Sequence, residues 1–201
     1  MKDSETNKTN YDLALEQFVL YWGEMASAWG INKTMAQIHA LLFASSEPLD
    51  TDTIMEQLSI SRGNANMNLH SLLDWKLVHR INFPGDRKDY YQADKDVWET
   101  AAKIIRERQR LEISPIRENL RECLNILNNE ETKDSKEAEF KDRIDDFLDL
   151  LELFEDFTHA ILPYVSHKNL KSLRKLVNLA LKRNLLRSKP EDILPLPKKK
   201  L

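Results

Sequence analysis

Apolar residues recur at helical spacing through most of the 201 residues of this chain. Near the N-terminus they follow alternating steps of four and three residues: Tyr11, Leu15, Phe18, Trp22, Met25 and Trp29. This stripe predicts one helix of about five turns that ends near Gly30 and buries one side against a partner. A second helix is predicted to follow and to end at the turn 45–48, with these residues facing inward: Met35, Ile38, Leu41 and Leu42.

Two shorter helices are predicted next. Asp50 has the position of a helix N-cap, and Leu49 can pack on Ile54 across the first turn of that helix. Ser61 is a second predicted N-cap, and the helix after it, 62–75, carries its apolar residues on one face: Ala65, Leu69, Leu72 and Leu73. Two helices joined by a short turn, after an earlier supporting helix, are typical of a helix-turn-helix.

The hydrophobic period changes after this helix. Residues 78–82 and 89–93 alternate between apolar and polar positions, and the residues between them, 83–87, have the composition of a turn. A β-hairpin directly after a helix-turn-helix is the wing of a winged helix, and these are the only strands that the pattern predicts. The predicted fold class is therefore mainly α, a winged helix-turn-helix with one β-hairpin wing and additional helices at both ends.

The rest of the chain is predicted to be helical. Asp96 and Glu99 have capping-box spacing for a helix that reaches about Glu112. Ser114 followed by Pro115 predicts the start of another helix, which carries Cys123 on its apolar side. Two further helices are predicted over 136–162, with Phe140, Ile144, Phe147, Leu151 and Phe154 on one stripe, and over 169–187.

Composition restricts the class of protein. Apolar residues make up 41% and charged residues 31% of the chain, as in proteins rich in amphipathic helix. Cys123 is the only cysteine, which excludes an intramolecular disulfide and a cysteine-rich zinc module. The N-terminal residues are polar, and nowhere do 18 apolar residues run together, so we expect a cytoplasmic protein with no membrane span.

The formal net charge of −3 is the sum of two opposed segments. Between residues 116 and 160 there are 14 acidic and 6 basic residues, whereas from 168 to the end there are 11 basic and 2 acidic residues. A low net charge that arises in this way does not exclude nucleic acid as a partner.

The exposed face predicted for helix 62–75 has a composition that suits DNA bases. It carries Gly63, Asn64, Met67, His70, Ser71 and Asp74, with Asn66 at its edge. Asparagine can pair bidentately with adenine in the major groove, and methionine can contact the methyl group of thymine. Gly63 would let the helix N-terminus approach phosphates, which Arg62 and the free N–H groups favour. The alternative is that these small polar residues only fill a solvated face.

Three cations on the predicted hairpin are candidates for phosphate contacts: Arg80, Arg87 and Lys88. A projecting hairpin with a glycine at its turn can bring such side chains to the DNA backbone. The alternative is an ordinary charged turn, because Asp86 and Asp89 nearly cancel the charge of Arg87 and Lys88.

Residues 59–115 resemble the winged-helix region of a known family. The motif S-x-G-N-A-x-M-x-L begins at Ser61, W-x-L-V begins at Trp75, and P-G-D-R-K-x-Y-Y begins at Pro84. Together these motifs are similar to the GbsR-like branch of the MarR superfamily of bacterial transcriptional regulators. The resemblance covers approximately residues 22–110, about half of the chain.

The resemblance implies a homodimeric repressor that binds a palindromic operator in double-stranded DNA. The positions that match the DNA contacts are Ser61, Arg62, Gly63, Asn64, Asn66, Met67 and Asn68 on the helix, with Arg87 and Lys88 in the wing. We therefore expect an N-terminal tail and dimerisation helix (1–30), a winged-helix DNA-binding domain (31–112), a C-terminal helical dimerisation and effector region (113–189) and a basic flexible tail (190–201).

Some members of this branch sense choline-like osmoprotectants, and a quaternary ammonium requires an aromatic cage. The candidate cage residues are Tyr21, Trp22, Trp29 and Trp98. The alternative is that the Trp22 and Trp29 stripe belongs to the core or to a dimer seam.

Metal sites and catalytic motifs are not predicted. Glu155, His159 and His167 lack the spacing of a zinc site, and the chain has neither a glycine-rich phosphate loop nor a nucleophile elbow. We therefore expect no cofactor, no metal and no enzyme activity. The alternative to a sequence-specific regulator is a winged-helix module that binds other proteins, although such a surface is expected to carry aromatic anchors in place of amides.

Overall fold

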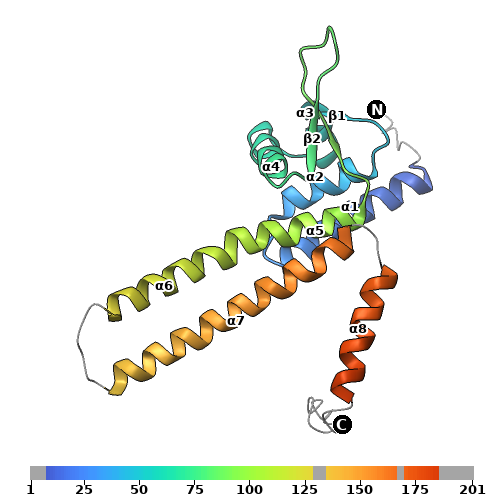
Figure 1. Cartoon of the computed structure of the whole chain (residues 1–201). Coiled ribbons are helices and arrows are strands. Elements are labelled where there is room, and N and C mark those ends of the chain that lie inside the picture. Colours follow the sequence, from blue (N-terminus) through green and yellow to red (C-terminus); the bar gives the residue numbers. More distant parts are fainter. Residues whose placement is uncertain (1–7, 129–134, 167–169, 186–201) are drawn as a thin grey trace, which may run out of the picture. The chain divides into compact units, whose positions relative to one another are not determined.

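The computed structural model describes residues 8–128, 135–166 and 170–185 (Figure 1). The chain divides into two compact units, Met1–Glu107 and Arg108–Leu201, which we call unit 1 and unit 2. The basic tail predicted at 190–201 lies outside the described residues.

Unit 1 contains the predicted winged helix. Its elements are α1 (Asn10–Ala28), α2 (Lys33–Ala44), β1 (Leu49–Asp50), α3 (Thr51–Leu58), α4 (Arg62–Asp74), β2 (Val78–Ile81), β3 (Tyr90–Ala93) and α5 (Val97–Arg108). The centre of its core consists of Ile38, Leu42, Ile54, Leu69, Leu72 and Val78, all almost fully buried. Because these residues come from α2, α3, α4 and β2, one core supports both the helix-turn-helix and the base of the wing.

Local capping produces the helix-turn-helix. The carboxylate of Asp50 accepts a hydrogen bond from the Thr53 N–H at 2.8 Å, and the Ser61 hydroxyl accepts one from the Asn64 N–H at 3.3 Å. Between the two helices Ser59 has a φ of 53°, a left-handed conformation that ends α3. These contacts confirm both predicted N-caps and the turn between them.

The sheet has one strand more than predicted. Its order is β1-β3-β2 with antiparallel pairing, and the predicted hairpin is confirmed by the register of Val78 opposite Ala93. On the other side of β3, Leu49 pairs with Tyr91. A strand of two residues has no alternation of its own, so only its pairing with β3 reveals it.

Helix α1 turns only part of the predicted stripe inward: Leu15, Phe18 and Trp22 are partly buried against the core of unit 1. Its buried residues are Val19, Gly23 and Ala26, whereas Tyr11 and Trp29 are 61% and 59% exposed. A Cβ at Gly23 would lie 2.7 Å from the Cγ of Gln37 in α2. The small residues thus permit a close approach of α1 to α2, while Tyr11 and Trp29, at the two ends of the stripe, stay outside the core of unit 1.

Unit 2 contains the helices η1 (Gln109–Ile113), α6 (Ser114–Asn128), α7 (Ser135–Ser166) and α8 (Leu170–Leu185). The predicted helix start at Ser114 coincides with the first residue of α6, but Ser114 is not an N-cap, because its helical angles of −59° and −42° continue the turn of η1. Pro115 has no N–H, and its ring would clash with the Leu111 carbonyl in a regular α-helix. The wider π-helical turn of η1 accommodates such a residue without ending the helix.

Helices α6 and α7 pack as an antiparallel pair (Figure 1). Arg121 forms an ion pair with Glu152 at 3.0 Å, and Arg117, one turn earlier, pairs with Glu155, one turn later. Only part of the predicted stripe of α7 is buried: Ile144 and Leu151 are covered, whereas Phe140, Phe147 and Phe154 are about half exposed. Cys123, which the sequence pattern places on the apolar side of α6, is exposed.

Candidate nucleic-acid interface

Helix α4 presents most of its predicted contact residues to solvent. Ser61, Arg62, Gly63, Asn66, Met67 and His70 are exposed, and Asn64 is half-buried. Met67 is 59% exposed, so its apolar side chain is open to a partner. Ala65, Leu69 and Leu72 face the core instead. The polar and apolar faces therefore separate as the spacing predicts.

Asn68 departs from this pattern. It is 2% exposed, and its amide nitrogen donates to the Asn64 carbonyl oxygen at 2.8 Å and to the Asn64 Oδ1 at 2.7 Å. Asn68 lies on the same side of the helix as the buried Ala65 and Leu72, so it is not presented on the surface as the family resemblance implied. Its hydrogen bond occupies the amide oxygen of Asn64 and leaves the amide nitrogen of Asn64 available to a partner.

The N-terminus of α4 is uncovered at Gly63. A Cβ at this position would meet no atom within 4 Å, and the backbone does not have a positive φ. Neither packing nor backbone conformation therefore requires glycine here. An added side chain would instead project over the first turn of α4, where free N–H groups favour an anion.

Two of the predicted phosphate-binding cations are paired with carboxylates of β1 and α3. Arg62 forms an ion pair with Asp52, and Lys88 of the wing pairs with Asp50 and lies 3.4 Å from Asp52. Hydrogen bonds from Lys88 and then Thr53 lower the pKa of Asp50 to about 2. Arg62, followed by Lys88, lowers the pKa of Asp52, and the two carboxylates raise the pKa of Lys88. The sequence did not predict this cluster because its members are up to 38 residues apart.

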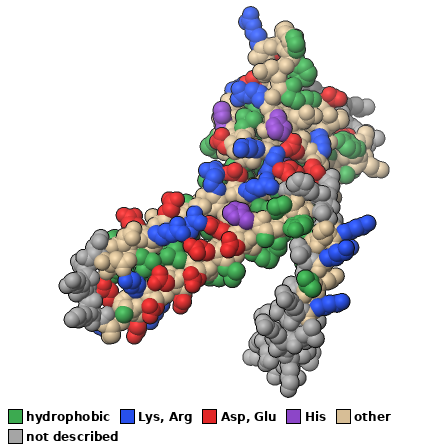
Figure 2. Space-filling view, in the orientation of Figure 1, with side chains coloured by type: hydrophobic (Ala, Val, Ile, Leu, Met, Phe, Trp, Pro, Cys, Tyr) green, Lys and Arg blue, Asp and Glu red, His purple; other side chains and the backbone are tan. Residues whose placement is uncertain are grey.

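The wing has an ordered base and an exposed cation near its turn. Phe83 and Tyr90 pack edge to face with ring centroids 4.9 Å apart, and Gly85 has a φ of 84° at the turn. Arg80 forms an ion pair with Asp89 at 3.4 Å, which partly neutralises the charge of Arg80. Arg87 is exposed and forms no ion pair within the described part of the chain. Figure 2 shows Lys and Arg side chains at the projecting end of the hairpin and again near its base.

The four aromatic residues predicted to bind a ligand do not form one cage. Trp22 and Trp29 line an apolar cavity of about 380 Å³ in unit 1, together with Trp75 of the α4 C-terminus, which the sequence did not single out. Tyr21 and Trp98 are not among the residues around this cavity. Tyr21 is instead 65% exposed on the surface of α1. Of the four predicted residues, only Trp22 and Trp29 therefore lie around the same cavity.

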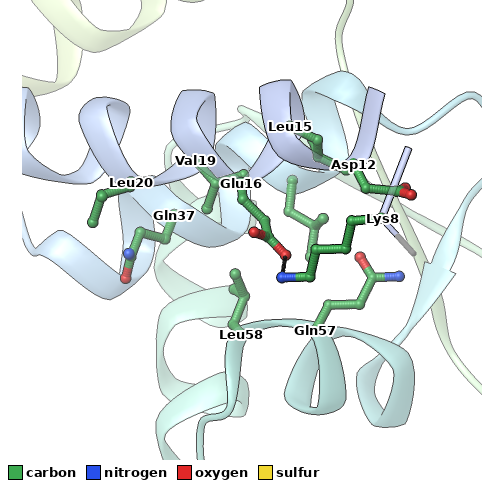
Figure 3. A pocket seen from close by; sticks show the side chains of 10 residues that line it. Lys8, Asp12, Leu15, Glu16, Val19, Leu20, Gln37, Gln57 and Leu58 are labelled. Carbon is green, nitrogen blue, oxygen red and sulfur yellow. Dashed lines mark hydrogen bonds and ion pairs between the residues drawn. The ribbon is translucent and has the colours of Figure 1, made fainter. Parts of the chain in front are cut away.

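A second hollow lies between α1, α2 and α3 (Figure 3). It is lined by charged and polar side chains as well as apolar ones, and Lys8 forms an ion pair with Glu16 across it. None of the residues predicted to contact DNA or ligand lines this hollow.

Among the described residues no group of three or more His, Cys, Asp or Glu side chains is arranged to hold a metal ion. Glu155 is paired with Arg117, and His167 lies outside the described residues. Over the same ranges no helix is long and apolar enough to cross a membrane.

Known proteins with similar sequences and folds are regulators by name. No protein-family model matches the chain. It is 22% identical over 137 residues to YvaV of Bacillus subtilis (strain 168), a protein named as an HTH-type transcriptional regulator, covering 64% of this chain and 75% of that protein. A crystal structure of a transcriptional regulator superposes with a TM-score of 0.60 at 17% identity, over 77% of this chain and 99% of the other. The chain therefore has the fold of a winged helix-turn-helix regulator, and its relatives in sequence and structure are named transcriptional regulators.

Proposed function

We propose that this protein is a homodimeric, sequence-specific DNA-binding repressor of the GbsR-like branch of the MarR superfamily, and that a small ligand modulates it. The observation that carries the proposal is the exposed face of α4, which combines amides and an exposed methionine with an uncovered N-terminus. Such a face can pair with base edges in the major groove and accept a phosphate at the helix N-terminus.

The two parts of the winged helix have different roles in this proposal. Asn64, Asn66 and Met67 contact bases, whereas Arg87 in the wing contacts the phosphate backbone. Arg62 and Lys88 exchange the carboxylates of Asp50 and Asp52 for phosphates when DNA binds. This exchange lowers the gain from each phosphate contact, because an existing ion pair must first be broken.

Unit 2 supports the dimer in this proposal. Phe147, Leu150, Phe154 and Phe157 of α7 follow steps of three and four residues and are between 48% and 62% exposed. An uncovered apolar stripe at this spacing is typical of a helix that packs against a second helix. A two-fold dimer would present two α4 helices to two half-sites of a palindromic operator.

Selection of binding sites from a random duplex library by the full chain tests the proposal. We expect enrichment of an inverted repeat whose half-sites lie about one helical turn apart, or a multiple of it. A reporter promoter that carries the enriched site should lose expression when the protein is present. Absence of any enriched sequence from a folded protein would contradict sequence-specific binding, and increased reporter expression would contradict repression.

A further inference from the structure

Asn68 is a polar side chain on the buried face of α4. It is 2% exposed, and the other buried residues of this helix are Ala65, Leu69 and Leu72. An amide in such a place costs free energy unless its hydrogen bonds are formed inside the protein. Asn68 donates two hydrogen bonds to one residue, Asn64, which lies one turn earlier and is half-buried. The pair therefore connects the buried side of α4 to the side that carries the proposed base contacts.

The two hydrogen bonds fix the orientation of both amides. The main-chain carbonyl of Asn64 can only accept, so the atom of Asn68 that lies 2.8 Å from it is the amide nitrogen. The second N–H of the same nitrogen is donated to the Asn64 side chain at 2.7 Å, so the atom that receives it is the oxygen Oδ1. Turning over the Asn64 amide would place two N–H donors face to face. Asn68 thus holds the Asn64 amide in one of its two orientations.

As a consequence, Asn64 offers donors to a partner. Its Oδ1 accepts from Asn68, and its amide nitrogen is left with two N–H groups. A bidentate pair with adenine uses both ends of an asparagine amide, the nitrogen as donor to N7 and the oxygen as acceptor from N6. In the orientation that Asn68 imposes, Asn64 lacks the acceptor that adenine requires.

The major-groove edges of the four bases differ in how well they suit a group that only donates. Guanine presents two acceptors, N7 and O6, whereas thymine presents one acceptor. Adenine presents one acceptor and one donor, and cytosine presents a donor. The two N–H groups of Asn64 therefore match guanine best, because the amino group of adenine or cytosine would face them without an acceptor.

We propose that Asn68 is a positioning residue for base recognition: it holds the Asn64 amide so that Asn64 reads a guanine, where a freely turning asparagine would read adenine. The inference rests on the proposed function, because it names the base edge that one residue of α4 selects in the operator. It gives Asn68 a different role from the direct DNA contact that the family resemblance implied.

The base preference of the full chain at one operator position tests the inference. This position is the one whose preference disappears in Asn64→Ala, and the wild-type protein should bind the duplex with guanine there about tenfold or more tightly than the duplex with adenine. Asn68→Leu replaces the buried amide by an apolar side chain of similar size and releases the Asn64 amide. It should reduce the guanine-to-adenine affinity ratio by about fivefold or more, measured by fluorescence anisotropy.

Asn68→Ser tests the same step without adding apolar volume. Its single O–H can donate to the Asn64 carbonyl, as the Ser71 hydroxyl donates to the Met67 carbonyl at 3.2 Å, and leaves the Asn64 side chain without a donor. The affinity ratio should fall as in Asn68→Leu. In an Asn64→Ala background, Asn68→Leu should cause no further change at this position, because the amide that it releases is absent. A general loss of stability, checked by thermal unfolding, would weaken binding to both duplexes alike and leave the ratio unchanged.

The hydrogen bonds of Asn68 can be measured without DNA. In the free full chain, the side-chain amide protons of Asn68 should exchange with solvent about tenfold or more slowly than those of the exposed Asn66, as followed by NMR. Equal exchange rates, an operator with no position that depends on Asn64, or a wild-type preference for another base there would each overturn the inference. So would an unchanged ratio in folded Asn68→Leu or Asn68→Ser. If the wild-type chain selects no sequence, the proposed function fails and the guanine contact fails with it, whereas selection with an unchanged ratio contradicts this inference alone.

Discussion

Asp52 is the residue that connects the proposed DNA contacts of α4 and the wing. Arg62 forms an ion pair with it, and Lys88 lies 3.4 Å away. Because the carboxylate holds both cations near one point, it competes with DNA phosphates for them. The affinity of the protein for DNA should therefore depend on a residue that does not itself contact DNA.

Asp52→Asn should raise DNA affinity by about threefold to tenfold for all sequences and make it more sensitive to salt. The reason is that Arg62 and Lys88 no longer leave a carboxylate when they bind phosphate. Fluorescence anisotropy with labelled duplexes over a range of salt concentrations measures both quantities. Glu56→Gln removes the same charge from α3 at an exposed position with no ion pair in the described residues, and serves as the control. Equal effects in the two variants would show that only general charge matters.

His39 makes the stability of unit 1 dependent on pH. Its pKa is about 4 in the folded protein and about 6.5 when exposed, so the unfolded chain binds more protons between these values. The contribution of neutral His39 to the free energy of unfolding should therefore be complete above pH 6.5. As the pH decreases to 4, the free energy of unfolding should fall by up to about 3 kcal/mol. The lowered pKa of Asp50 acts in a separate window, with stability lost between about pH 4 and 2.

Chemical denaturation at pH 7 and at pH 4.5 measures this dependence. His39→Phe should retain the ring contacts with Trp22 and Phe43 and reduce the loss of stability on acidification. His70→Gln removes an exposed histidine and should leave the loss unchanged. An undiminished loss in His39→Phe would mean that another group is responsible.

At the scale of secondary structure, α4 and the β2–β3 hairpin should separate specificity from affinity. Asn66 is exposed on α4, and Arg87 is exposed in the hairpin without an ion pair in the described residues. Asn66→Ala should reduce the preference between operator variants by roughly 1–3 kcal/mol if the amide pairs bidentately with a base. Arg87→Ala should weaken binding to all sequences alike and reduce the salt slope by about one unit.

A panel of operator variants titrated at several salt concentrations distinguishes the two effects. Asn125→Ala, an exposed asparagine of α6, is the control and should change neither quantity. The same change in Asn66→Ala and Arg87→Ala would contradict the assignment of bases to α4 and phosphates to the wing.

At the scale of the whole molecule, the apolar stripe of α7 should hold two copies together. Phe147 and Leu150 are 50% and 59% exposed in the single chain, whereas Ile144 and Leu148 are buried. The buried pair explains how α7 packs within unit 2, and the exposed pair remains for a partner. Acidic side chains cover much of the surface of the α6–α7 pair in Figure 2, so DNA would be repelled from it.

Phe147→Glu combined with Leu150→Glu should convert the dimer to a monomer, because two charges in an apolar interface lose hydration without a counter-charge. Sedimentation at micromolar concentration measures the mass, and circular dichroism checks that α7 remains helical. His159→Glu adds a carboxylate at another exposed position of α7 and should remain dimeric. A monomeric wild-type protein, with and without operator DNA, would contradict the dimer.

Local interactions explain what the sequence alone determined. The caps at Asp50 and Ser61 join residues three positions apart, and the hairpin joins neighbouring segments through a short turn. The period of 3.6 residues also assigned Ala65, Leu69 and Leu72 to the core and Met67 to the surface. Each of these features depends on residues close in sequence, so the helix-turn-helix and its wing could be predicted without coordinates.

Contacts between distant segments decided the rest. β1 exists only because Leu49 pairs with Tyr91, and the charge cluster forms only because the wing brings Lys88 to Asp50. The burial of Asn68 and the half-exposed state of Phe147 depend on which neighbouring helix covers each face. Periodicity identifies an apolar face, but several elements compete to cover that face, and only their packing determines which residues remain for DNA, ligand or a second copy.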